Sequence, residues 1–318
     1  MPYDSIISRS DAAALIPEEA AKEIIQGVPE QSSALKLFDR LPDMNRKQYR
    51  MPVLSFLPIT YFVSGEADTD GVKQTSEIKW ENKYIYAEEI AAIVPIPEAV
   101  IEDTDYDIWT QVTPRIQAAI GKTIDAAVFF GTNAPATWPT DIVTAATSAG
   151  NAVTLGTGVD VYDDLYGENG VFAAVEAEGF AITMCVGALS MKAKLRGLRD
   201  ANGQPIYMTS MSDKTTYELD GTTVIYPMNG AWNAALALMV VGQAKEAVYS
   251  IRQDITYKVL EEAVIQDAAG EIVFNLAQQD MIALRVVMRL GWQVPNPINP
   301  IQPTEGNRYP FGVLKPSA

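Results

Sequence analysis

A long alternating run near the C-terminal end constrains the fold more than any other segment of this chain. Residues 278–297 read QQDMIALRVVMRLGWQVPNP. One set of alternate positions is apolar and the other carries both arginines: Ile282, Leu284, Val286, Met288 and Leu290 against Ala283, Arg285, Val287 and Arg289. A period of two residues predicts a long β-strand. Gly291 and Trp292 end the alternation, and Pro295 and Pro297 cannot extend a ladder.

The arginine face of this strand suits ion pairing. Arg285 and Arg289 lie roughly 13 Å apart at ~3.3 Å per residue. Two fixed guanidinium groups on an otherwise apolar strand are better suited to pairing with another element or another subunit than to catalysis. We therefore expect Arg285, Arg289 and the adjacent Trp292 to contribute to a subunit interface.

Composition indicates a globular protein. The 318 residues are 48% hydrophobic and 20% charged, which predicts a large core and one or two compact regions. The longest apolar stretch, Ala231 to Val241, is too short to cross a membrane and contains Asn233. The first residues lack the basic and apolar parts of a signal peptide. The single cysteine, Cys185, excludes an internal disulfide framework and is expected to be a buried core residue.

The charged residues and the absence of histidine exclude several classes of function. With 24 basic and 40 acidic residues the net charge is −16, so the chain as a whole is a poor nucleic-acid binder. An acidic container would instead repel packed DNA from its wall. Without histidine the usual general base, catalytic triad and metal ligand are missing. We expect no enzyme activity, no cofactor and no metal. An acidic carbohydrate-active enzyme using Glu88 and Glu89 is geometrically poor, because adjacent strand residues point to opposite faces.

The first half of the chain predicts an arm, a long hairpin and a long helix. Residues 1–45 read as an arm with two short helices. Residues 49–63 and 75–94 read as the two strands of a hairpin with a polar tip at 64–71. Such a ribbon is marginal alone in water, so we expect a neighbouring subunit to cover it. A helix from about 106 to 130 would span roughly 37 Å, and Pro114 should kink it or split off its first turn.

The second half predicts mixed helices and strands. We expect helices at 171–178, ended by Gly179, and at 190–199. Strands are expected at 180–189, buried on both faces, and at 248–252, 255–260 and 272–276, with a turn at 267–270. Together with the closing strand, this pattern predicts an α+β fold.

This order of elements resembles phage major capsid proteins of the Hong Kong ninety-seven fold along almost the whole chain. The matching segments are VPIPEAVIED at 94–103, IDAAVFFG at 124–131, residues 192–203 and the closing strand. The resemblance implies an N-terminal arm (1–45) and an extension-loop hairpin (46–93). It further implies a peripheral domain (94–160 and 244–318) with a spine helix at about 104–131, and a central axial α/β domain (161–243).

The resemblance implies a structural protein that self-assembles as hexamers and pentamers into an icosahedral head enclosing double-stranded DNA. The alternative is an encapsulin-like bacterial nanocompartment enclosing an enzyme. Scaffolding, portal and decoration proteins are implied partners; DNA would be enclosed without sequence-specific binding, and no membrane is involved. The expected location is the virion, after assembly in the host bacterial cytoplasm. Some family members carry a scaffolding segment before the arm; this chain begins at the arm, so we expect a separate scaffold.

The hairpin supplies further candidate interface residues: Lys73, Lys79, Trp80 and Lys83. In some members of the family a lysine is joined to an asparagine of another subunit by an isopeptide bond. No matching asparagine and glutamate can be identified here, and the reaction needs a lysine deprotonated by burial. Salt bridges between subunits are the preferred interpretation of these lysines.

Other motifs have structural interpretations. Asp103, Asp105 and Asp107 lack the glycine and distal glutamate of a calcium loop, which favours helix capping. The segments 68–71 and 156–158 are expected to be turns. The cluster Lys192, Lys194, Arg196 and Arg199 is expected to be a solvated helix face, with a partner contact as the alternative.

Overall fold

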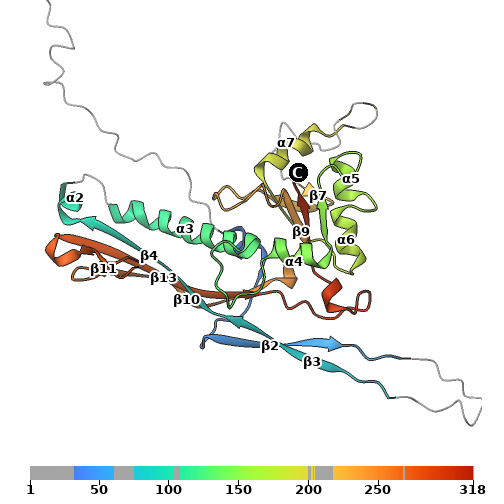
Figure 1. Ribbon diagram of the computed structural model, residues 1–318, viewed down its shortest axis with the longest axis horizontal. Coiled ribbons are helices and arrows are strands. Elements are labelled where there is room, and N and C mark those ends of the chain that lie inside the picture. The colour runs from blue at the N-terminus through green and yellow to red at the C-terminus, as the bar shows by residue number, and fades with distance from the viewer. Residues whose placement is uncertain are drawn as a thin grey trace, which may run out of the picture.

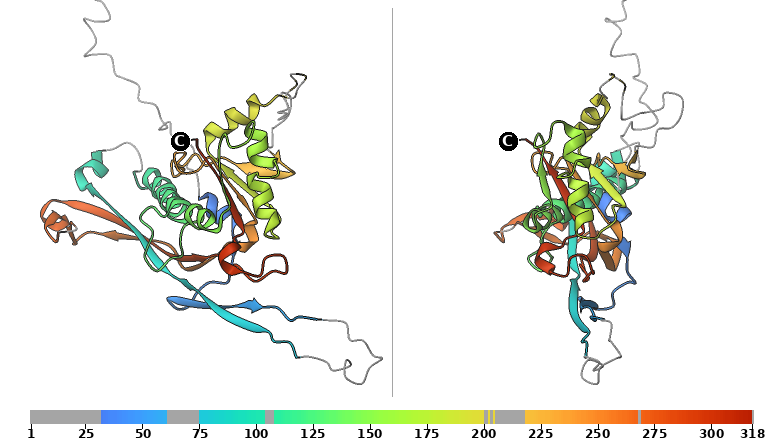
Figure 2. Two further views of the ribbon diagram at one scale, coloured as in Figure 1. Left: turned by 45° about the vertical axis from the view of Figure 1, so that its right-hand side comes forward. Right: turned by 90° about the vertical axis from the view of Figure 1, so that its right-hand side faces the viewer.

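The computed structural model describes residues 32–60, 75–103, 108–199, 202, 204, 218–267 and 269–317. Figure 1 shows three parts. A long helix lies along an elongated sheet, a compact region of helices and strands adjoins one end of that helix, and a two-stranded hairpin extends beyond the sheet. The left view of Figure 2 shows the same separation of the hairpin from the rest of the molecule.

The elongated sheet has four strands in the order β1-β10-β13-β4. They are β1 (Asp39–Arg40), β10 (Val248–Leu260), β13 (Met281–Gln293) and β4 (Glu88–Pro97). β13 confirms the predicted closing strand and pairs antiparallel with both neighbours. β10 is one strand, although two were predicted. Register shifts between Ile251 and Thr256 disturb the alternation without ending the strand.

The long helix α3 (Ile108–Phe130) packs on this sheet through one apolar stripe. The stripe and the even positions of β13 belong to one core cluster: Ile116, Ile120, Ile124 and Val128 with Leu284, Val286, Met288 and Leu290. α2 (Glu98–Asp103) precedes α3, and the expected start near residue 104 lies outside the described residues. α3 runs on through Pro114, so the proline does not split off a first turn.

The compact region is built on a six-stranded sheet in the order β5-β14-β9-β6-β8-β7. The strands are β5 (Ala152–Thr154), β14 (Phe311–Lys315), β9 (Met239–Gly242), β6 (Met184–Gly187), β8 (Thr222–Ile225) and β7 (Glu218–Leu219). Its helices are α4 (Ile142–Ala149), α5 (Val161–Tyr166), α6 (Val171–Ala177) and α7 (Leu189–Gly197). One face of the sheet joins the core of α3, and the other forms a second cluster with α5, α6 and α7.

The structure confirms the predicted helix end before Gly179 and the burial of Cys185, and it gives β6 a shorter range than predicted. α6 ends just before Gly179, whose φ of 86° is left-handed. β6 is shorter than predicted, but all four of its residues are buried. Cys185 is buried, and burial raises the pKa of its thiol to about 12. β5 and β14 pair into the six-stranded sheet, although their residues fall in ranges expected for the peripheral domain.

The hairpin consists of β2 (Gln48–Phe56) and β3 (Lys79–Tyr86), paired antiparallel. The predicted returning strand at 75–94 is wrong beyond Tyr86. The chain leaves the hairpin at the buried Ala87 and continues as β4 in the four-stranded sheet. No glycine or proline stands between Tyr86 and Val94, so the sequence gives no sign of the change of sheet.

Smaller elements complete the fold. α1 (Ser33–Leu37) precedes β1. β11 (Val264–Gln266) and β12 (Ile272–Asn275) form a second, short hairpin around the turn predicted at 267–270. Among the described residues, 3-10 turns occur at Ala244–Glu246, Leu276–Gln278 and Glu305–Asn307. None of the helices in the described part of the chain has the length and apolarity needed to span a bilayer.

Candidate assembly surfaces

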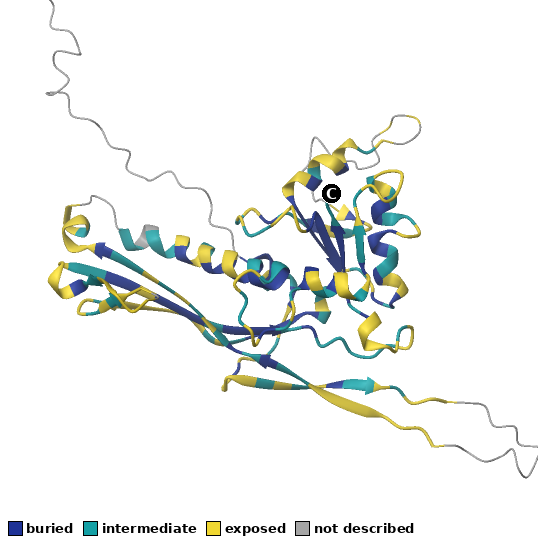
Figure 3. Ribbon diagram, viewed as in Figure 1, coloured by how far each residue is buried: buried dark blue, intermediate teal, exposed yellow. Residues whose placement is uncertain are grey.

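The hairpin exposes large apolar side chains that its own chain does not cover. Along β2 and β3, burial is confined to Val53 and Ile85, and the outer part of β3, residues 79–82, is exposed (Figure 3). Trp80 is 66% exposed, Ile59 68%, Ile78 44% and Phe56 40%. A two-stranded ribbon with apolar residues in water is suited to lie against another protein surface.

The predicted hairpin lysines have different surroundings. Lys79 Nζ lies 3.2 Å from Glu77 Oε2 and 5.9 Å from the centre of the Phe56 ring. Lys83 Nζ lies 2.5 Å from Glu305 Oε1 of its own chain. Lys83 therefore has an acidic partner in its own chain, and its contribution to a subunit interface stays a prediction. Lys73 lies outside the described residues, as does the 68–71 turn.

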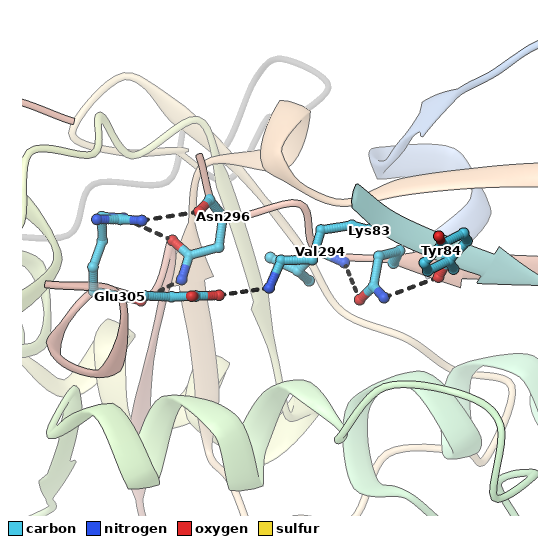
Figure 4. Close-up of polar contacts among 7 residues, drawn as sticks. Lys83, Tyr84, Val294, Asn296 and Glu305 are labelled. Carbon is cyan, nitrogen blue, oxygen red and sulfur yellow. Dashed lines mark hydrogen bonds and ion pairs between the residues drawn. The ribbon is translucent and has the colours of Figure 1, made fainter. Parts of the chain in front are cut away.

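The root of the hairpin is held by the segment that follows β13 (Figure 4). In addition to the Lys83–Glu305 ion pair, Gln293 Nε2 donates to the Tyr84 carbonyl at 3.1 Å. The Ile298 amide donates to the Leu54 carbonyl of β2, also at 3.1 Å. Both strands of the hairpin are thus tied to the 293–305 segment, which fixes the direction in which the ribbon leaves the body.

That segment is itself fixed by the buried Arg308, which is 3% exposed. Its guanidinium donates to the Gln302 carbonyl at 2.7 Å, to the Asn296 carbonyl at 3.0 Å and to Asn296 Oδ1 at 3.1 Å. The Asn296 side chain returns a 2.7 Å bond to the Arg308 carbonyl. Burial lowers the pKa of Arg308. We name residues 293–308 the bracket, because they join the hairpin to the six-stranded region.

The bracket is anchored to the six-stranded region through Glu178. Glu178 Oε2 accepts bonds from the Tyr309 amide at 2.7 Å and from Asn151 Nδ2 at 2.8 Å, and its carbonyl accepts from Asn299 Nδ2 at 2.8 Å. Burial raises the pKa of the Glu178 carboxyl, although these hydrogen bonds oppose the rise. The sequence predicted only an irregular tail here. A lone arginine among prolines and asparagines has no periodic signal that would identify the bracket.

The arginines of β13 differ in their partners. Arg289 stands opposite Glu89 of β4 and pairs with it, with Nε 2.8 Å from Glu89 Oε2. Arg285 is exposed, stands opposite Lys258 and Ile93, and forms no ion pair within the described part of the chain. Glu88 Oε1 lies 3.4 Å from Lys47 Nζ, so Glu88 and Glu89 pair with different cations.

Trp292 belongs to the core, at 1% exposure. β13 continues to Gln293, so Trp292 keeps the parity of Leu290 and points to the same side. Its ring stacks on Phe38 and meets Trp138 edge-on. The expectation that Trp292 contributes to a subunit interface is corrected accordingly. Gly291, on the other face of the strand, permits close approach of the chain near Ala87, since a Cβ there would lie 2.3 Å from the Tyr86 carbonyl oxygen.

A buried carboxylate fixes the start of α1, which lies within the expected arm. Asp125 of α3, 1% exposed, accepts bonds from Ser32 Oγ at 2.6 Å and from the Ser33 and Ala34 amides at 2.9 and 3.0 Å. Asn229 Nδ2 donates to it at 2.6 Å. The start of α1 is thus joined to the long helix and to the loop before β9.

The chain is similar to known proteins over nearly its whole length. The model of the phage capsid family matches residues 12–305. The major capsid protein of Staphylococcus phage 80alpha is 22% identical over 295 residues, covering 92% of this chain and 85% of that protein.

Solved structures agree with this match. A structure from Microbacterium phage Oxtober96 has a TM-score of 0.86 at 36% identity and covers 98% of this chain and 100% of its own. One from Mycobacterium phage Adephagia has a TM-score of 0.83 at 32% identity, covering 99% of both chains. These matches favour a phage head over a nanocompartment and confirm the capsid fold, with its structural rather than enzymatic role. The chain belongs to the phage capsid family, as a major capsid protein.

Proposed function

We propose that copies of this chain form hexamers and pentamers that close into an icosahedral head around double-stranded DNA. The observation that carries this proposal is the hairpin, whose root is fixed by the bracket and whose outer half exposes Ile59, Ile78 and Trp80. Burial of apolar surface contributes about 25 cal/mol per Å². A contact that is weak in one pair of subunits stabilises a shell because symmetry repeats it.

The proposed interface consists of Lys73, Lys79, Trp80, Lys83, Arg285 and Arg289, together with the arm. The proposed domains are the arm (1–45), the extension loop (46–93), the peripheral domain (94–160 and 244–318) and the axial domain (161–243). The pairing of β5 and β14 adds their strands to the axial sheet. Scaffolding, portal and decoration proteins are further proposed partners, and assembly takes place in the host cytoplasm.

The acidic chain encloses DNA without reading its sequence. A net charge of −16 disfavours close contact between wall and phosphate, so the DNA is confined rather than bound. Particles isolated from an infected host should contain DNA. A co-purifying enzyme in place of DNA would support the nanocompartment alternative.

Electron microscopy of the purified full chain tests assembly directly. We expect closed particles with hexameric and pentameric units, alone or after addition of the phage scaffolding protein. A chain that remains monomeric in every salt, pH and scaffold condition contradicts the proposal.

A further inference from the structure

The helix α7 carries a basic patch that the proposed contacts leave unused. The patch consists of Lys192, Lys194, Arg196 and Arg199. Met191 and Leu195 on the opposite side of α7 are buried in the second core cluster, so the charged side chains point outward. Lys194, Arg196 and Arg199 are exposed, and Leu189 beside them is 53% exposed.

An acidic patch of equal size lies on α5, α6 and the adjoining loops. It consists of Asp160, Asp163, Glu168 and Glu176, of which all but the half-buried Asp163 are exposed. Val159 beside them is 95% exposed and Tyr162 is 43% exposed. Figure 1 shows α7 and the α5–α6 pair as separate elements of the compact region, and they pack on the same face of the six-stranded sheet.

The charges of both patches, Lys192 apart, stay unpaired among the described residues: none of Lys194, Arg196, Arg199 or the four acidic side chains forms an ion pair there. Each patch repels itself, so two identical patches cannot face each other without a cost. A cyclic ring brings together two different surfaces of the same subunit, and this arrangement satisfies both patches at once.

We propose that the basic patch of one copy docks against the acidic patch of the next copy around each hexamer and pentamer. This inference rests on the proposed function and deepens it by naming the two surfaces that meet. Exposed ion pairs are individually weak, so their main effect is to fix the orientation of neighbours and exclude wrong pairings. Packaged DNA is a weaker occupant for α7, because it leaves the acidic patch without a counterpart.

Charge reversal of each patch tests the proposal, in a chain first shown to form particles. The basic-reversed variant carries Lys194→Glu, Arg196→Glu and Arg199→Glu, and the acidic-reversed variant carries Asp163→Lys, Glu168→Lys and Glu176→Lys, so that the net charge of each patch changes sign. Each alone should lower the yield of particles at least about tenfold at low salt, because like charges then meet. A chain carrying all six changes should regain wild-type yield. The control Lys122→Glu with Lys245→Glu reverses two exposed charges outside the proposed interfaces and should assemble normally.

A mixture of the two reversed variants gives the sharpest outcome. Their copies can alternate around a ring of six but not around a ring of five, so native mass spectrometry should detect mixed hexamers and no mixed pentamers. Unchanged assembly of both variants overturns the proposal, as does failure of the six-change chain while it remains folded by circular dichroism. Normal particles with reduced DNA from the basic-reversed variant would also overturn it, in favour of a DNA contact. Absence of wild-type particles would instead contradict the proposed function.

Discussion

At the scale of single residues, Asp125 joins three separate segments through one buried carboxylate. Its four partners come from the N-terminal side of α1 and from Asn229, and Ser32 Oγ also accepts from the Leu35 amide at 3.2 Å as the cap of α1. A carboxylate is suited to this position because it accepts several bonds and donates none. Its aspartate lies within the buried stripe of α3, a signal in the sequence for a buried polar contact.

Replacement of Asp125 should destabilise the folded chain. Asp125→Ala leaves two amides and two side-chain donors without their acceptor, which should lower the free energy of unfolding by about 3 kcal/mol. Urea unfolding of the unassembled chain measures this loss. Glu102→Ala, at an exposed position of α2, serves as the control. Equal stability of the two variants would show that the Asp125 bonds contribute nothing.

Glu178 gives the chain a pH dependence with a defined sign. Burial raises the pKa of this carboxyl in the folded state, so the folded chain binds its proton more tightly than the unfolded chain. The stabilisation is therefore present below the unfolded pKa of about 4.3 and is lost as the pH rises through the folded value. Glu178→Gln keeps an oxygen for the Tyr309 and Asn151 bonds and should remove this loss. Urea unfolding of wild type and variant, measured from about pH 4 to about pH 8 in steps of about one pH unit, checks this. If the free energy of unfolding depends on pH in the same way for both chains, the assignment to Glu178 is contradicted.

At the scale of elements, the bracket determines whether the hairpin is held in one direction. The bracket has no helix or strand periodicity and is ordered through Arg308, which donates three bonds. At the hairpin, the bracket is held by two single hydrogen bonds and the Lys83–Glu305 ion pair. At the six-stranded region, Asn299 contributes a single hydrogen bond to the Glu178 carbonyl. The hairpin direction should therefore depend on Arg308 more than on Lys83 or Glu305, because surface ion pairs contribute little.

Arg308→Ala should release the bracket while the two sheets stay folded. Hydrogen exchange of the Ile298 amide, which donates to Leu54, should accelerate by at least about tenfold, followed by the amides of β2 and β3. Amides of β6 and β9 should remain protected. Arg40→Ala is the matched control, since Arg40 pairs only with the nearby exposed Asp43 in the described structure. Unchanged hydrogen exchange at the Ile298 amide in the Arg308 variant would show that Arg308 does not hold the bracket against the hairpin.

Elements with a regular period could be predicted from the sequence, and elements held by tertiary contacts could not. β13 and α3 follow from alternate and three-to-four spacing of apolar residues. The single strand β10 could not, because its bulge breaks the alternation near Gln253. The change from the hairpin to the four-stranded sheet at Ala87 could not be predicted either, because no glycine or proline marks it. The expectation that Trp292 lies at an interface treats Gly291 and Trp292 as the end of the strand. The parity of Trp292 with Leu290 indicates the core instead.

At the scale of the whole molecule, the chain separates residues that stabilise the subunit from residues available for assembly. The cores under α3 and beneath α5, α6 and α7 are formed by side chains of one chain. The hairpin leaves this body and exposes apolar side chains, and α7 and α5–α6 present opposite charges. A monomer of this kind can fold first and associate afterwards, because its core does not depend on its neighbours.

Two tryptophans test this separation. Trp80 is 66% exposed on the hairpin, and Trp292 is 1% exposed in the core. Trp80→Ser, combined with Ile78→Ser, should change the unfolding free energy of the unassembled chain by less than about 0.5 kcal/mol. The same variant should abolish particles in electron microscopy, because the apolar contact is lost in every repeated interface. Trp292→Ala should instead lower the unfolding free energy by about 3–5 kcal/mol. Should the Trp80 variant assemble normally, or lose as much stability as the Trp292 variant, the hairpin would be part of the subunit's own fold and not its assembly surface.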